Sequence, residues 1–70
     1  MNYVAVTSSN IAAIGYDEHR GVLGVRFRAG REYWYSGVSR SVYQSFLGAG
    51  SKGRYFETFV KRLYGCVRVG

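Results

Sequence analysis

Residues 23–35 read Leu23-Gly24-Val25-Arg26-Phe27-Arg28-Ala29-Gly30-Arg31-Glu32-Tyr33-Trp34-Tyr35, which is two alternating segments joined by a glycine-bearing turn. In the first segment every second residue is apolar, namely Leu23, Val25 and Phe27. Tyr33 and Tyr35 repeat this spacing in the second segment. A period of two is typical of a half-buried β-strand. The stretch therefore predicts a β-hairpin with one apolar face.

The opposite face of this hairpin should be basic and aromatic. Because side chains alternate across a strand, Arg26, Arg28 and Trp34 should point away from the apolar face. A Trp between arginines suits base stacking or a contact with a second protein chain, and burial under the N-terminal segment is the alternative. Tyr33 and Tyr35 either stack bases or lie under helices as part of the core.

Further strands are expected on both sides of the hairpin. Residues 11–16 form a moderately apolar strand, and residues 17–21 form a loop in which Gly21 takes a positive φ. The next strands should cover residues 22–28 and 32–37, with a tight turn at 29–31. Residues 1–7 form either a short strand or an arm, and residues 66–70 form a short strand or a tail.

After residue 38 the period changes to that of helices. Ser39 is a plausible N-cap, and an apolar stripe follows it: Val42, Tyr43, Phe46 and Leu47. Residues 48–50 end this helix, and Ser51 begins a second one that runs to Gly65. Its inner face should hold Tyr55 or Phe56 with Phe59, Val60 and Leu63, and its outer face should hold Glu57, Lys61 and Arg62.

These elements predict an α+β fold in a single domain over residues 1–70. The expected order is β-β-β-α-α, a small antiparallel meander of three or four strands covered on one face by two C-terminal helices. The expected core consists of seven apolar residues: Leu23, Val25, Phe27, Phe46, Phe56, Val60 and Leu63.

Charge and composition limit the classes of function. The 70 residues carry a net charge of +6, which attracts polyanions, although the cations are spread along the chain and an ordinary solvated surface stays an alternative. No segment reaches the roughly 18 apolar residues of a membrane span, and no signal peptide is recognisable. The single Cys66 suits a reducing, cytoplasmic setting and is expected to be buried beside Tyr64.

An ordered set of short motifs resembles the KTSC domain. These motifs are Ser8-Ser9, Ile14-Gly15-Tyr16-Asp17, Leu23-x-Val25-x-Phe27-x-x-Gly30, Tyr33-x-Tyr35, Val38, Val42-Tyr43, Ala49-x-Ser51-x-Gly53-x-Tyr55-Phe56 and Tyr64. That family is named for the C-terminal domain of some lysyl-tRNA synthetases and also occurs as small free-standing bacterial and phage proteins. The resemblance implies a binding role, for which RNA is the usual suggestion. In such sequences a Pro often follows the Tyr-x-Tyr strand, whereas Ser39 stands here.

The glycine-rich loop at residues 48–54 is the best local candidate for an anion site. Exposed backbone N–H groups, the start of a helix and two cations favour a phosphate there, and the residues that would hold it are Ser51, Lys52, Gly53 and Arg54. The spacing is not that of a P-loop, so nucleotide hydrolysis is not supported. The alternative is an ordinary turn whose glycines allow close packing.

The remaining polar residues do not predict an enzyme. One His and one Cys cannot form a usual zinc site, and no carboxylate pair or catalytic triad is recognisable, so we expect no catalytic residue, metal or cofactor. The expected partner is nucleic acid, RNA before DNA, with further phosphate contacts from Arg26, Arg28 and Arg62. The alternatives are a phage-type protein-interaction or inhibitor protein, a binder of a small phosphorylated nucleotide, and self-association into a homo-oligomer. No membrane partner is expected.

Overall fold

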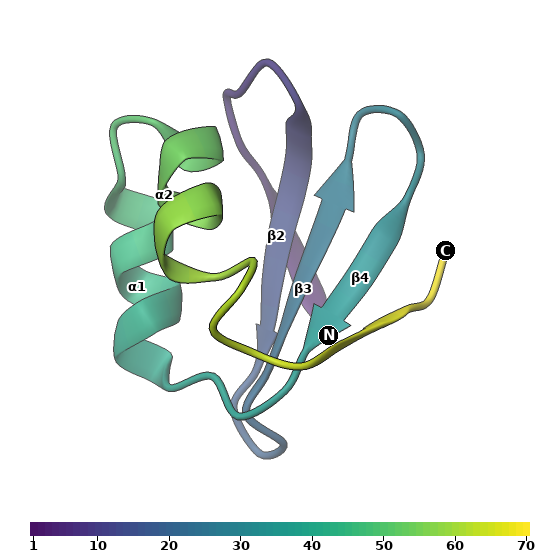
Figure 1. The fold of residues 1–70 in the computed structure, drawn as a ribbon, viewed down its shortest axis with the longest axis vertical. Helices are drawn as coiled ribbons and strands as arrows, with labels where there is room; N and C mark the ends of the chain where they lie inside the picture. Colours follow the sequence, from purple (N-terminus) through teal and green to yellow (C-terminus); the bar gives the residue numbers. More distant parts are fainter.

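The computed structural model describes all 70 residues, which form one antiparallel sheet and two helices. The elements in chain order are β1 (Asn2–Ala5), β2 (Ile11–Asp17), β3 (Val22–Phe27), β4 (Glu32–Tyr35), α1 (Arg40–Gly48), α2 (Lys52–Phe59) and β5 (Cys66–Arg68). Figure 1 shows both helices together on one side of the sheet, near β2, with no helix over β4. Neither helix has the length and apolar character needed to cross a membrane.

The predicted α+β fold and antiparallel meander are confirmed, and the sheet is larger than expected. Its five strands lie in the order β1-β2-β3-β4-β5. Both ends of the chain join it: β1 pairs with β2, and β5 returns after the helices to pair with β4. Residues 1–7 thus contribute a strand rather than an arm, and the expected tail also contains a strand. The element order is therefore β-β-β-β-α-α-β.

Glycines form the two tight turns, as predicted. Gly21 has a φ of 63° and Gly30 a φ of 105°, conformations that L side chains rarely adopt. The turn at Gly30 sets the register of β3 on β4, in which Leu23 is opposite Tyr35 and Val25 is opposite Tyr33. This register places the apolar residues of both strands on the same face of the sheet, under the helices.

Serine caps begin both helices, also as predicted. The Ser39 side chain accepts from the backbone N–H of Val42, and the Ser51 side chain accepts from that of Arg54. The end of α2 differs from the prediction. The helix stops at Phe59, and residues 60–63 form turns instead.

The early end of α2 explains one wrong core assignment, Leu63, which is 64% exposed. Phe59 was predicted on the inner face of the helix and is 50% exposed. Helical spacing holds an apolar stripe on one face only while the helix continues, so Leu63 leaves that face. Phe59, the last helical residue, packs on the ring of Tyr55, with centroids 4.9 Å apart.

The rest of the predicted core is confirmed. Leu23, Val25, Phe46, Phe56 and Val60 are buried. Phe27 is half-buried and packs against this cluster. The core also contains Tyr35, for which burial under the helices was one of the two alternatives, and three residues that were not assigned to it: Ile11, Ile14 and Val38.

Candidate functional site

A groove of about 640 Å³ lies beside α2, on the face of the sheet that the helices cover only in part. Its walls are the loop before β2, the turn between β3 and β4, α2, and the segment around Lys61 and Cys66. Its volume falls within the range of small-molecule pockets. The helices pack toward β2, so on the helix-facing side of β4 Tyr35 is covered by Phe56 of α2 while Tyr33 stays half-buried at the groove.

Four aromatic rings form the floor of the groove: Phe27, Tyr33, Tyr35 and Phe56. They contact one another in a closed circuit, with successive centroid distances of 6.1, 6.5, 5.7 and 5.3 Å. Three of the four contacts are edge-to-face, which is a favourable arrangement for aromatic pairs. Tyr35 and Phe56 are each 4% exposed, whereas Phe27 and Tyr33 are half-buried. The floor is therefore anchored in the core and exposes part of two rings.

The rim of the groove is charged. Arg28, Arg31 and Lys61 supply three cations, and Glu57 supplies one carboxylate. Glu57 pairs with Lys61 at 3.6 Å, and both side chains are more than half exposed. Arg28 donates from Nε to the Ser8 carbonyl at 2.7 Å, while Arg31 takes part in none of the ion pairs of the chain. Positive charge therefore exceeds negative charge around the aromatic floor.

One wall of the groove is the loop that leads into β2. The backbone carbonyl of Asn10 accepts from the N–H of Arg28 at 2.9 Å, and its side-chain oxygen accepts from the Ser8 hydroxyl at 3.2 Å. A Cβ on Gly53 would lie 3.1 Å from that side-chain oxygen. Gly53 thus allows α2 to approach the loop closely, and Asn10 lies at the groove, where its side-chain amide can donate to a ligand.

Tyr35 and Cys66 lie across from each other on β4 and β5. Burial raises the pKa of Tyr35 to about 12, and the Cys66 thiol and the Tyr33 hydroxyl beside it add to the shift. The phenol therefore stays neutral at physiological pH. Cys66 itself is exposed, so the prediction that it is buried beside Tyr64 is wrong: its strand lies at the edge of the sheet, where no element covers it.

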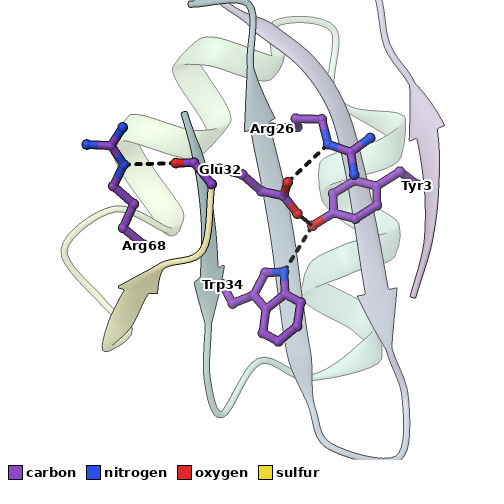
Figure 2. A network of polar contacts seen from close by, with 6 residues as sticks. Tyr3, Arg26, Glu32, Trp34 and Arg68 are labelled. Carbon is purple, nitrogen blue, oxygen red and sulfur yellow. Dashed lines mark hydrogen bonds and ion pairs between the residues drawn. The ribbon is translucent and has the colours of Figure 1, made fainter. Parts of the chain in front are cut away.

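The outer face of the sheet carries a second set of aromatic and charged side chains, drawn in Figure 2. The Tyr3 ring lies across Gly24, where a Cβ would overlap its hydroxyl. That hydroxyl donates to Glu32 and accepts from the Trp34 indole N–H at 3.1 Å. Arg26 pairs with Glu32 at 3.3 Å and stacks over the Tyr3 ring at 3.9 Å. Each of the four side chains in this network has a partner inside the chain.

These contacts shift the pKa values of two groups in the network, the Tyr3 phenol and the Glu32 carboxyl. Burial raises the pKa of Tyr3 to about 12, and the hydrogen bond to the Glu32 carboxylate adds to the shift. The same hydrogen bond, together with Arg26, holds the pKa of Glu32 below its ordinary value of 4.5. At neutral pH the pair therefore consists of a phenol donor and a carboxylate acceptor.

The structure divides the residues that the sequence grouped as a binding surface. Arg26 and Trp34 share the outer face, as predicted, but both are bonded within the network, and Trp34 is half-buried. Arg28 was expected beside them and lies at the groove instead. The alternation of side chains ends with β3 at Phe27, so Arg28 belongs to the turn. Tyr33 and Tyr35 lie on the other face, in the groove floor.

None of the residues of the glycine-rich loop lines the groove, although Gly53 packs on Asn10 at its wall. The Ser51 hydroxyl caps α2, and the Lys52 ammonium donates to the Ala49 carbonyl at 2.5 Å. Arg54 and Arg62 are exposed. A phosphate role for Ser51, Lys52, Gly53, Arg54 and Arg62 stays a prediction.

Sequence reasoning missed several groove residues. Asn10, Arg31, Glu57 and Lys61 were not proposed as ligand contacts, and Glu57 and Lys61 were assigned only to the outer face of the second helix. Glu57 and Lys61 are four residues apart, a spacing at which side chains can pair, and Lys61 still pairs with Glu57 from the turn just after α2. Arg31 follows the turn glycine, a position that hairpin loops often expose. No group of three His, Cys, Asp or Glu side chains converges on a metal-like site.

Comparisons with known proteins found a matching family model, relatives and a solved structure that are similar to this chain. The family model of the KTSC domain matches residues 7–64. An uncharacterized protein from Stutzerimonas stutzeri is 39% identical over 61 residues, covering 87% of this chain and 86% of that protein. A protein from Tsukamurella paurometabola is 41% identical over 56 residues, covering 80% and 84%. The crystal structure of a KTSC domain protein from Yersinia pestis is similar with a TM-score of 0.95 at 38% identity, covering 99% of this chain and 97% of that one.

Proposed function

The chain belongs to the KTSC domain family, and we propose that it is a small non-enzymatic module that binds nucleic acid, RNA before DNA, in the groove between α2 and β4. The observation that carries the proposal is the combination of an aromatic floor with a cationic rim in one concavity. A floor of this kind suits unpaired bases, and cations at the rim suit the phosphates that connect them.

The shape of the groove favours a single strand. Bases inside a duplex are stacked on each other and cannot reach the half-buried rings of Phe27 and Tyr33. An unpaired base has a free face and can stack there, while Arg28 and Arg31 contact the backbone. The net charge of +6 adds long-range attraction for any polyanion.

Binding of short, dye-labelled RNA strands, followed by fluorescence anisotropy, tests this function. We expect Tyr33→Ala to weaken binding by about 1–3 kcal/mol, since a base loses its stacking partner. A double variant, Arg31→Gln with Lys61→Gln, should weaken binding to all sequences alike and lower the dependence of log K on log salt by about 0.7 per lost phosphate contact.

A matched control separates local contacts from overall charge. Arg20→Gln with Arg40→Gln removes the same two charges at the other hairpin loop and at the start of α1, where these residues pair with Asp17 and Glu18. This control should keep most of the affinity. Equal losses in the two double variants, or no binding of any strand at low salt, would contradict the proposal.

A second candidate function is protein interaction, as in a phage-type inhibitor. It is favoured by the exposed side chains of Phe59 and Leu63, 50% and 64% accessible, at the end of α2. Phe59→Ser with Leu63→Ser would abolish such an interaction and leave strand binding unchanged. The salt dependence of the affinity distinguishes binding of a strand from capture of a small phosphorylated nucleotide in the groove. A small ligand releases few counterions, so its affinity should change little with salt.

A further inference from the structure

One acidic side chain lies among the cations of the groove. Glu57 projects from the flank of α2 that faces the groove, and Lys61 lies in the turn that follows this helix. A carboxylate repels phosphate, so its presence opposes binding of the backbone at this wall. It does not serve the fold by burial, because its side chain is 58% exposed. Its only ion pair, with Lys61 at 3.6 Å, is of the surface kind that contributes little to stability.

This position suits a group that donates hydrogen bonds. An ionised carboxylate has two acceptor oxygens and no donor. Within the groove, the partly exposed rings of Phe27 and Tyr33 provide the stacking surface, and the cations Arg28 and Arg31 come from the turn between β3 and β4. A nucleotide whose phosphate lies at that turn can stack its base on the floor and present its edge to α2.

We propose that the groove selects an unpaired guanine, with Glu57 accepting from the N1–H and N2–H₂ groups of its Watson–Crick edge; this specificity rests on the nucleic-acid function proposed above. Guanine is the base whose edge carries two adjacent donors, which match the two oxygens of a carboxylate. Adenine and cytosine present one amino group beside an acceptor nitrogen, and uracil presents one N–H between two carbonyls. These acceptors repel a carboxylate. The base displaces Lys61 from Glu57, and the Lys61 ammonium is then free to contact a phosphate.

The test uses a short oligo-U strand with a single central position that is guanine, inosine, adenine, cytosine or uracil. We expect the guanine strand to bind about tenfold more tightly than the adenine, cytosine and uracil strands, the discrimination typical of a bidentate contact to a base. Inosine lacks only the N2 amino group and should bind with intermediate affinity. Glu57→Gln should remove the guanine preference and keep or raise the affinity for plain oligo-U, since a negative charge is lost. Glu18→Gln, at the exposed hairpin loop, is the matched control and should keep the preference.

The outcomes separate this specificity from the underlying function. Equal affinity for all five strands, or a guanine preference that survives Glu57→Gln, would overturn the role of Glu57 and leave nucleic-acid binding in place. Failure of the unmodified protein to bind any strand at low salt would overturn the proposed function itself. Loss of the preference in Glu18→Gln as well as in Glu57→Gln would show that overall charge sets it, which also contradicts the proposal.

Discussion

The two faces of the sheet carry similar residue types and use them differently. On the outer face, Arg26, Glu32, Trp34 and Tyr3 bond to one another, so their charges and hydrogen-bonding groups have partners within the chain. On the groove face, Arg31 has no ion pair and two aromatic rings are only half-buried. A basic, aromatic composition therefore does not identify a binding surface. What distinguishes the two faces is whether the chain supplies its own partners.

The largest expected effect is on the groove floor. Phe56 is 4% exposed and contacts the rings of Phe27 and Tyr35, so Phe56→Ala leaves a cavity under the floor. We expect a loss of about 3–5 kcal/mol in the free energy of unfolding, enough to unfold much of a domain this small. Urea denaturation followed by circular dichroism measures it. Phe59→Ala, at a half-exposed position of the same helix, should cost far less; equal costs would show that Phe56 does not anchor the floor.

The stability of the outer face is expected to depend on the absence of a side chain at Gly24. Gly24 lies under Tyr3, so Gly24→Ala forces the ring, and with it β1, away from the sheet. Overpacking of this kind typically costs about 1–3 kcal/mol. Gly48→Ala is the control, since no atom lies within 4 Å of a Cβ at that helical position. A Gly24→Ala protein as stable as Gly48→Ala, by the same denaturation measurement, would mean that the Tyr3 ring is not held there.

The outer network should also make stability depend on pH. The folded pKa of Glu32 is below its ordinary 4.5, so its contribution is present above 4.5 and is lost as pH falls through the folded pKa. The pKa of Tyr3 is raised, so its contribution is complete below 10.0 and is lost as pH rises through about 12.

Glu32→Gln should therefore destabilise the protein at neutral pH and flatten the decline of stability at acid pH. The measurement is the denaturation midpoint at neutral pH and at a pH well below 4.5, with Glu57→Gln as the control. An acid decline that is identical in Glu32→Gln and in the unmodified protein would rule out the network as its source.

The smallest expected effect compares one arginine from each face. Arg31→Gln should lower the salt dependence of RNA binding by about 0.7, the value for one lost phosphate contact to a single strand. Arg26→Gln removes the same charge from the outer face and should leave that slope unchanged. Titrations at several salt concentrations provide both slopes. A drop of equal size in both variants would remove the distinction between the faces.

Much of the fold follows from local signals in the sequence. Alternation in residues 23–35, the turn glycines Gly21 and Gly30 and the caps Ser39 and Ser51 each act over a few residues, and each prediction was confirmed. The predicted end of α2 was wrong, because no local signal in the sequence marks the turns after Phe59. Strands β1 and β5 stayed open alternatives, because their pairing joins distant parts of the chain.

The site was harder to predict than the fold. Tyr33, Tyr35 and Arg28 were proposed as ligand contacts and do lie together at the groove. The partnership of Trp34 with Tyr3 spans 31 residues, and nothing in the local sequence of Trp34 indicates it. The groove itself depends on where the helices lie over the sheet, which no single residue determines. Tyr3 bonds to Trp34 and covers part of the outer face, and self-association stays a prediction.

Amide NMR of the isotope-labelled protein, titrated with a short guanine-containing RNA strand, tests most directly whether the groove face is the binding surface. The account predicts that shift changes gather at the groove, on Asn10, Arg31, Tyr33 and Glu57, while the amides of Tyr3 and Gly24 and the indole of Trp34 stay in place. Shift changes centred on Tyr3 and Trp34, with the groove residues unmoved, would contradict it.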